Sequence, residues 1–274
     1  MTAHCYLGVG TLRTAAGAPT TADAALLTAI EGASDTIDSE CSRTFQPYTA
    51  TKYFSPTGSS SLTLPIGTDL IAITTLKTDD DGDGVFETTW ATTDYVLLPR
   101  NALVGPAPSP YWQIRVAADG DYSFPVGDDL VEIVGTWGYA LDLLTLAATT
   151  SEVLDASETG VDVSSVSEIE VGNTIQVDSE QMYVTAINTL TLTVERGVNG
   201  TTAATHLTAA TIKRHRYPRN IALATQLLAM KNFRRKDAPF GVAGSGEMGT
   251  LIMMPRYDSD YESKLQNYRL VSVA

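Results

Sequence analysis

The chain has 274 residues, of which 43% are hydrophobic, and a formal net charge of −14. This length supports one large domain or two smaller ones, each with its own core. No run approaches the roughly 20 apolar residues of a membrane-spanning helix, and the N-terminus lacks the basic head and apolar stretch of a secretory signal. An acidic chain repels nucleic acid, so we expect neither sequence reading nor tight phosphate binding. We expect a soluble protein made and used in a cytoplasm.

The charge is distributed unevenly along the chain. Residues 213–274 contain eleven Lys and Arg against five Asp and Glu, and the remainder is strongly acidic. A basic end on an acidic chain favours a protein partner there, although the asymmetry could serve solubility alone. The two cysteines, Cys5 and Cys41, are expected to be free thiols, because disulfides are rare in a reducing compartment.

The clearest predicted helix covers residues 20–45. Thr20, followed three positions later by Asp23, resembles a capping box. Apolar residues then recur at steps of three and four, which places them on one helix face: Leu26, Ile30, Ala33, Ile37 and Cys41.

Strands and turns are predicted between Thr49 and Tyr139. Gly, Pro, Asp and Asn clusters separate runs rich in β-branched and aromatic residues. These runs are Ser61–Leu64, Leu70–Leu76, Phe86–Trp90, Tyr95–Leu98, Tyr111–Val116 and Leu130–Trp137.

The composition changes again at Leu143. Residues 143–215 are rich in Thr, Val, Ser and Glu and alternate as a small antiparallel β-domain would, for example in Thr174–Val177 and Leu190–Val194. After Pro218 a helix is predicted, with an apolar band wide enough to pack against two neighbours. A Gly-rich loop at Gly241–Gly249 and a final helix at Tyr257–Tyr268 follow.

Two motifs invite a ligand interpretation. Gly244–Gly249 matches G-x-G-x-x-G, but no βαβ unit surrounds it, so we interpret it as a loop. Asp79, Asp81 and Asp83, with Gly84, match the first half of a calcium loop. Position 12 of that loop is Trp90 instead of glutamate, so we favour an acidic hairpin turn with weak calcium affinity at most.

Catalytic motifs are absent from the sequence. His4, His206 and His215 have no metal-ligand spacing to one another or to a cysteine. Neither a nucleophile elbow nor a P-loop occurs. Asn199-Gly200-Thr201 fits a glycosylation acceptor, but a hairpin turn is the better interpretation without secretion. We expect no catalytic residue, no cofactor and no enzyme activity.

Four segments together resemble the head–tail connector (adaptor) proteins of tailed phages. They are Asp23–Asp38 with Cys41–Phe45 and Thr51–Phe54; Ile73–Glu87 with Asp94–Pro99; Val131–Tyr139; and Lys236–Gly244 with Pro255–Asp258. In that family the Trp-Gly-Tyr strand runs almost directly into the helix before Lys-Asp-Ala-Pro-Phe-Gly, whereas here residues 143–215 intervene. This insert resembles a β-module of phage structural proteins, through Gly172–Tyr183 and Glu195–His206.

The resemblance implies an α+β fold with a small helical connector core, a strand and hairpin region, and an inserted antiparallel β-domain. The core would comprise residues 1–142 and 216–274, and the insert, with its ends close together, residues 143–215. We expect the insert to fold autonomously.

The resemblance also implies a structural virion protein without chemistry. Such adaptors form a ring, usually of twelve copies, that docks beneath the portal, extends the DNA channel and offers a lower surface to a stopper or tail-completion protein. DNA would pass without specific binding, and no membrane is involved. The alternative is a decoration or host-attachment module on the virion surface.

The portal contact is predicted in the basic C-terminal part. Here positive charge is interleaved with apolar and aromatic residues that could anchor an interface. The predicted contact residues are Arg234, Arg235, Lys236, Phe240, Met253, Met254, Tyr257 and Tyr261. The alternative is that Arg234–Lys236 only complements the dipole of the helix before it.

Overall fold

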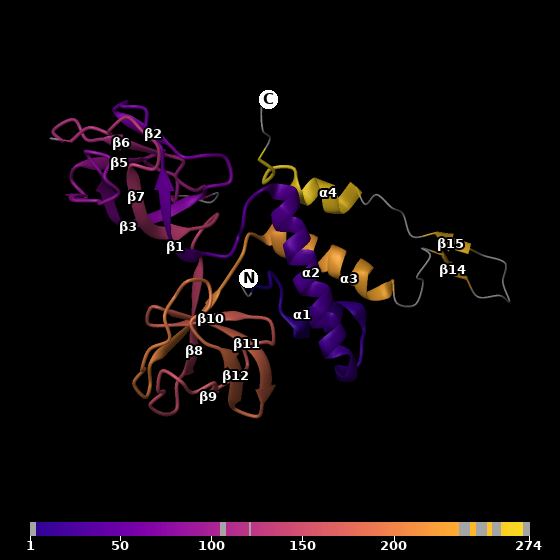
Figure 1. Cartoon of the computed structure of the whole chain (residues 1–274). Helices are drawn as coiled ribbons and strands as arrows, with labels where there is room; N and C mark the ends of the chain where they lie inside the picture. Colours follow the sequence, from indigo (N-terminus) through magenta and orange to yellow (C-terminus); the bar gives the residue numbers. More distant parts are fainter. Residues whose placement is uncertain are drawn as a thin grey trace. The chain divides into compact units, whose positions relative to one another are not determined.

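The computed structural model describes residues 4–104, 108–120, 122–235, 242–244, 251–253 and 259–270 (Figure 1). Helices and antiparallel sheets alternate along the chain, so the predicted α+β class is confirmed. The chain divides into two compact units. Unit 1 comprises Met1–Cys41, Asp142–Val198 and Thr202–Arg269, and unit 2 comprises Ser42–Leu141, Asn199–Thr201 and Leu270–Ala274.

This division differs from the predicted domains, because the helices group with residues 143–215 and not with the strands before them. The physical reason is a shared apolar cluster in unit 1. Tyr183, with Val171 and Val198, packs with helical residues such as Leu26 and Ala29. The insert is therefore packed against helices, and its autonomous folding stays a prediction.

The helices of unit 1 are α1 (Val9–Ala16), α2 (Asp23–Cys41), α3 (Arg219–Arg234) and α4 (Ser259–Leu265), with a 3₁₀ turn at Thr20–Ala22. The predicted stripe of α2 is confirmed, since all five of its members are buried. Both cysteines are buried and free. No helix in the described ranges has the length and apolarity to cross a membrane.

The predicted capping box is wrong. The 3₁₀ turn follows Pro19, which provides no side-chain cap, and α2 begins only at Asp23. The Asp23 carboxylate instead accepts a hydrogen bond from Arg13 of α1 at 2.9 Å. Helix α1 itself was not predicted, because its eight residues are too short for a clear apolar period.

The insert forms one antiparallel sheet in the order β8-β13-β10-β11-β12-β9. A bridge between Thr150 and Val163 joins the two ends of this order, so the sheet closes into a small barrel. Closure leaves no long unpaired edge. The strands are β8 (Leu143–Thr149), β9 (Gly160–Asp162), β10 (Thr174–Val177), β11 (Glu180–Asn188), β12 (Thr191–Glu195) and β13 (Thr211–His215).

The two ends of the barrel segment lie side by side, as predicted. Leu143 of β8 pairs with His215 of β13. Next to this pair along the chain, the Arg216 N–H donates to the Asp142 carbonyl at 2.9 Å. The side chains of these two residues form an ion pair at 2.6 Å. The chain therefore enters and leaves the barrel at one place, the geometry that tolerates an insertion.

Unit 2 contains a four-stranded sheet, β1-β7-β3-β4, and a three-stranded sheet, β2-β6-β5. Residues of β7 alternate between buried and half-buried along the strand, with Trp137 completely buried. All six predicted runs contain a strand. The strands are β1 (Tyr48–Phe54), β2 (Ser61–Thr63), β3 (Leu70–Thr78), β4 (Thr88–Trp90), β5 (Tyr95–Leu98), β6 (Gln113–Val116) and β7 (Val131–Trp137).

The predicted Gly-rich loop contains a strand. Strand β14 (Val242–Gly244) pairs with β15 (Leu251–Met253), which corrects the expectation for the first part of Gly241–Gly249. Glycine composition alone predicted a loop, whereas backbone pairing with the nearby β15 determines the strand. Helix α4 falls within the predicted 257–268 segment.

Candidate functional site

The structure describes only some of the predicted partner-contact residues. Arg234 ends α3 and Arg235 follows it, and both side chains are exposed. The Arg235 N–H donates to the carbonyls of Lys231 and Asn232 at 3.2 Å each. Positive charge at this helix end meets the negative end of the helix dipole. The backbone of Met253 lies in β15, whereas Lys236, Phe240, Met254 and Tyr257 lie outside the described residues.

One residue of the predicted contact must be removed from it. Tyr261 on α4 is only 7% exposed, so its ring packs inside unit 1 instead of facing a partner. Burial, followed by the nearby charge of Glu40, raises the pKa of its hydroxyl above the usual range. The aromatic residue type suggested an interface anchor, but the helical period of α4 places this ring inward together with Leu265.

The basic region is also less free than its composition suggests. Arg269, which follows α4, donates to Glu40 of α2 at 2.7 Å and pairs with Glu262 at 2.6 Å. This arginine therefore fastens α4 to the end of α2. The exposed positive charge at the C-terminal end of α3 remains that of Arg234 and Arg235.

The acidic loop forms the predicted hairpin between β3 and β4, in which Leu76 pairs with Trp90. The Asp79 carboxylate accepts backbone hydrogen bonds from Gly82 at 2.7 Å and Gly84 at 2.8 Å. Burial opposes ionisation of Asp79, but these hydrogen bonds outweigh it, so its pKa is lowered. Asp83 instead accepts from the Val85 N–H at 2.8 Å.

Three carboxylates in this loop lie close enough together to bind a cation, although one of them differs from the three that were predicted. Oxygens of Asp79, Asp81 and Glu87 lie within 4.8 Å of one another. Asp83, one of the three calcium candidates, is not in this group. Because Asp81 and Glu87 are exposed and Asp79 already accepts two backbone N–H groups, the structural turn remains the favoured interpretation.

A buried polar cluster in the barrel was not predicted. Glu180 of β11 is completely buried and accepts two hydrogen bonds from Arg196, at 2.6 and 2.8 Å. Its carboxylate also accepts the N–H groups of Gly197 at 3.0 Å and Ala204 at 2.9 Å. His206 lies with Nε2 2.8 Å from Glu180 and Nδ1 2.8 Å from Asp178. Together these contacts fasten residues 196–206 to the β10–β11 hairpin.

This cluster gives a physical role to the two insert segments that resemble a phage β-module, since Glu180 lies in the first and Arg196 and His206 in the second. Burial opposes the charge on Glu180, but the hydrogen bonds from Arg196, Ala204, His206 and Gly197 dominate and lower its pKa to about 2. A glutamate, an arginine and a histidine far apart in sequence gave no local signal. The role of this group is structural, because every partner is internal to the barrel.

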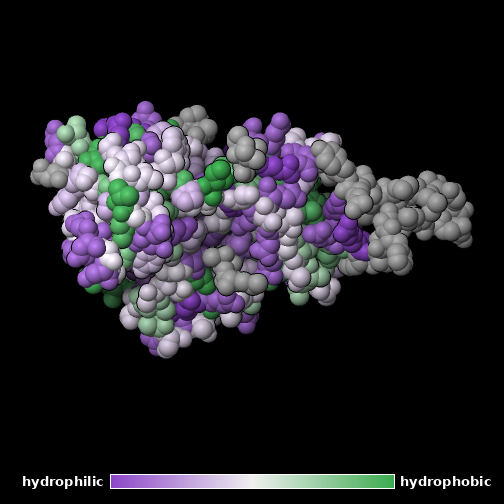
Figure 2. Space-filling model, turned by 45° about the horizontal axis from the view of Figure 1, so that its top comes forward, coloured by the Kyte–Doolittle hydropathy of each residue, from purple (hydrophilic) through white to green (hydrophobic). Residues whose placement is uncertain are grey.

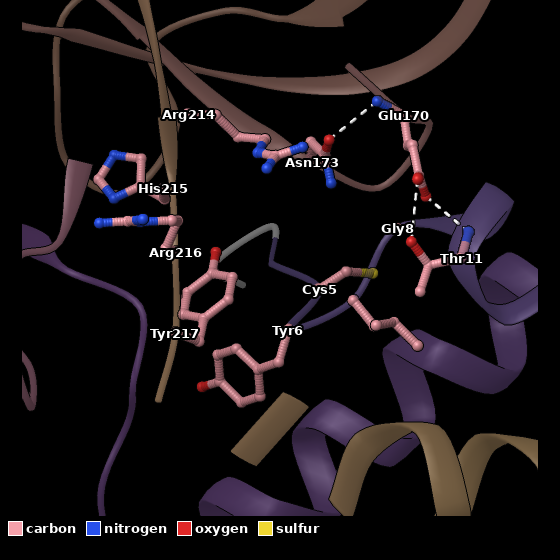
Figure 3. A pocket seen from close by; sticks show the side chains of 11 residues that line it. Cys5, Tyr6, Gly8, Thr11, Glu170, Asn173, Arg214, His215, Arg216 and Tyr217 are labelled. Atoms are coloured by element: carbon pink, nitrogen blue, oxygen red, sulfur yellow. Dashed lines mark hydrogen bonds between the residues drawn. The ribbon is translucent and has the colours of Figure 1, made fainter. Parts of the chain in front are cut away.

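A cavity of about 230 Å³ lies where the barrel meets the helices of unit 1 (Figure 3). The N-terminal segment lines one side, and Arg214–Tyr217 with Glu170 and Asn173 line the other. Arg214 extends toward Asn173, whereas His215 and Arg216 extend from the other side of the strand (Figure 3).

Glu170 and Thr11, two polar residues of this cavity, are hydrogen-bonded to each other. Glu170 Oε2 accepts the Thr11 N–H at 2.8 Å, and Oε1 accepts the Thr11 hydroxyl at 2.9 Å. This carboxylate caps α1, whose own N-cap residue, Gly8, has no side chain. A Cβ at Gly8 would overlap Glu170, so glycine is needed there. Burial raises the pKa of the Cys5 thiol to about 12, which excludes a reactive thiolate.

His215 is the other titratable group in this wall. It is 4% exposed, and neither ring nitrogen has a hydrogen-bond partner among the residues that the structure describes. Burial lowers its pKa to about 4, so the imidazole is neutral at pH 7. It contributes a buried ring and no charge.

Exposed apolar side chains are dispersed. The most exposed are Val126, Leu207 and Val104, at 77%, 74% and 73%, and they lie far apart in sequence. The face in Figure 2 accordingly carries separate apolar groups among polar ones. Scattered residues of this kind are normal on a protein surface.

No protein-family model matches the chain, and no curated protein matches it. Among solved structures, the chain is similar to one from the neck of an empty GTA particle computed with C6 symmetry. The two are 14% identical, with a TM-score of 0.42, over 98% of this chain and 92% of the other. We take no residue role from this similarity.

Proposed function

We propose that the protein is a structural virion protein, a ring-forming head–tail connector that docks on the portal and extends the DNA channel. It joins the capsid to a stopper or tail-completion protein below. Assembly takes place in the host cytoplasm, and the protein then resides at the head–tail interface of the virion. It needs no cofactor and catalyses no reaction.

One observation carries the proposal. Helix α2 carries the first connector-like segment, and helix α3 ends just before the last one. In the sequence, the barrel lies between these two helices. In the fold, Ala29 and Ile30 of α2 and Ala229 of α3 belong to one apolar cluster. Because the ends of the barrel adjoin at Asp142 and Arg216, the insertion does not separate the chain segments that flank it. A connector core with an insert at one point accounts for this arrangement.

The charge distribution supports a channel without specific DNA affinity. Binding to DNA gains free energy from counterion release only where cations meet phosphates. An acidic chain with its excess of positive charge near one end suits passage of DNA beside a protein contact. Arg234 and Arg235 remain the described residues of the proposed portal contact, because both are exposed at the end of α3.

Co-sedimentation with purified portal tests this function. The protein alone is expected to be mostly monomeric, and to assemble into a ring on portal. Arg234→Glu with Arg235→Glu should fold normally yet lose portal binding. Truncation after Gly244 also removes the buried Tyr261 and Leu265 of α4, so the charge reversal is the variant that tests the contact. Arg115→Glu, also at an exposed site, is the matched control. Wild-type affinity of the charge-reversal variant would place docking elsewhere. A stable dimer that ignores portal would contradict the connector function and favour a decoration or host-attachment module.

A further inference from the structure

The outward face of α3 is apolar between two arginines. Ile221, Ala224 and Ala229 are buried and define its inner side. The helical period places Arg219, Leu223, Leu227 and Arg234 on the opposite side. Leu223 is 45% exposed, Leu227 is half-buried, and both arginines are exposed. Arg219 makes no ion pair with any described residue.

The outward face of α2 has the opposite character. Its inner side is the stripe of Leu26, Ile30 and Ala33, so Thr28, Gly32, Asp35 and Ser39 lie opposite, and all four are exposed. A Cβ added at Gly32 would meet nothing within 4 Å, so this face is open. The Asp35 side chain is 74% exposed, and its carboxylate lies 3.9 Å from the His4 Nε2.

The two faces match in spacing. At 1.5 Å of rise per residue, Leu223 and Leu227 are separated by about 6 Å along α3, and so are Gly32 and Thr28 along α2. If the two helices came from different copies and packed antiparallel, Leu223 would meet Gly32 and Leu227 would meet Thr28. In this register Arg219 extends beyond Leu223 toward Asp35, which lies one turn beyond Gly32. Small residues allow leucine side chains to enter the groove between them.

We propose that the α3 face of one copy (Arg219, Leu223 and Leu227) packs on the α2 face of the next copy (Thr28, Gly32 and Asp35). This proposal rests on the proposed ring and names its subunit interface. Both faces belong to unit 1, and α2 and α3 contact each other through their inner sides. The same pair therefore cannot form within one chain, whereas it can form between two.

Charge complementarity and symmetry identify the occupant as a second copy. The cationic, apolar face and the acidic, small-residue face are different patches of one chain, so their contact is heterologous. A heterologous contact generates a ring when its rotation closes. The other carboxylates near the α2 face are occupied, since Glu31 accepts from Tyr183 at 3.0 Å and Glu40 from Arg269 at 2.7 Å. Asp35 is left as the carboxylate for an incoming arginine.

Cysteine cross-linking between two variants tests the register. Leu227→Cys and Thr28→Cys proteins are mixed under mild oxidation, with and without portal. The mixture should give about tenfold more disulfide-linked dimer than either variant alone, as a face-to-face contact holds the thiols together. The native Cys5 and Cys41, 1% and 0% exposed, do not compete. Leu190→Cys, at a 47% exposed barrel position, replaces Leu227→Cys in the control mixture. Dimer at the control level under both conditions overturns the proposal.

Charge reversal provides an independent readout. Arg219→Glu or Asp35→Arg alone should lower the cross-linking yield several-fold, and the two reversals, one on each partner, should restore it. Failure of that rescue also overturns the register. If Arg219→Glu loses portal binding while the Leu227→Cys and Thr28→Cys mixture gives no cross-link, this face contacts the portal instead. Cross-linked rings that ignore portal would instead retain the interface and refute the connector function.

Discussion

Both β regions of the molecule are antiparallel, but the residues in their interiors differ. The barrel of unit 1 has an aliphatic core, around Ile175 and Val184, beside a buried carboxylate held by arginine and histidine. The sheets of unit 2 enclose an aromatic core in which Trp90 stacks on Phe124 with ring centroids 4.8 Å apart. The barrel therefore adds a completely buried carboxylate to its apolar packing, whereas the packing of unit 2 is richer in aromatic rings. Acid should distinguish them.

The largest effect is expected from separating the buried pair in the barrel. Arg196→Ala leaves Glu180 buried without its main partner and should cost about 3–5 kcal/mol of unfolding free energy. The double variant Glu180→Gln with Arg196→Met should recover a large part of this loss, because it removes both charges. Denaturant unfolding, with hydrogen exchange to localise the change, measures both. Equal losses in the single and double variants would contradict a charge-dependent barrel.

Trp137→Ala is the corresponding change in unit 2. It removes a completely buried indole and its hydrogen bond to the Ala50 carbonyl at 2.9 Å, and should cost about 3–5 kcal/mol. Hydrogen exchange should become faster in β1, β3 and β7 at every pH between 3 and 7. If exchange became faster mainly in the barrel, the two cores would not be independent.

The pH dependence of stability should belong mainly to unit 1. Glu180 has a folded pKa of about 2, below its ordinary value of 4.5, so its stabilising contribution is complete above pH 4.5 and is lost as the pH falls toward 2. His215 has a folded pKa of about 4, below 6.5, so stability is also lost as the pH falls from 6.5 toward 4.

Two substitutions separate these pH windows. Glu180→Gln should flatten the dependence below pH 4.5, and His215→Leu the dependence between pH 6.5 and 4. Thermal unfolding at a series of pH values shows which window disappears. An unchanged profile in either variant would mean that another group produces the loss.

Much of the fold could be predicted from the sequence. The period of Leu26, Ile30 and Ala33 identified α2, and the alternation in residues 143–215 identified an antiparallel β-domain, because each pattern is local. The grouping of the barrel with the helices was missed, since it depends on long-range packing of Tyr183. The burial of Tyr261 and the glutamate cap of α1 were missed for the same reason.

The smallest predicted effect concerns that cap. Glu170→Gln keeps the side-chain size but weakens the two hydrogen bonds to Thr11, and should cost about 1 kcal/mol. Amide exchange at the start of α1 should rise while exchange in unit 2 is unchanged. Glu168→Gln, at an exposed position two residues earlier, is the matched control. A larger loss in the control would contradict the capping role.

The central claim, that this chain is a connector, is tested most directly by locating it in an assembled particle. A low-resolution image of particles carrying a tagged subunit should show a ring of density directly beneath the portal, coaxial with the DNA channel. Density dispersed over the capsid surface or confined to the far end of the tail would contradict the connector function.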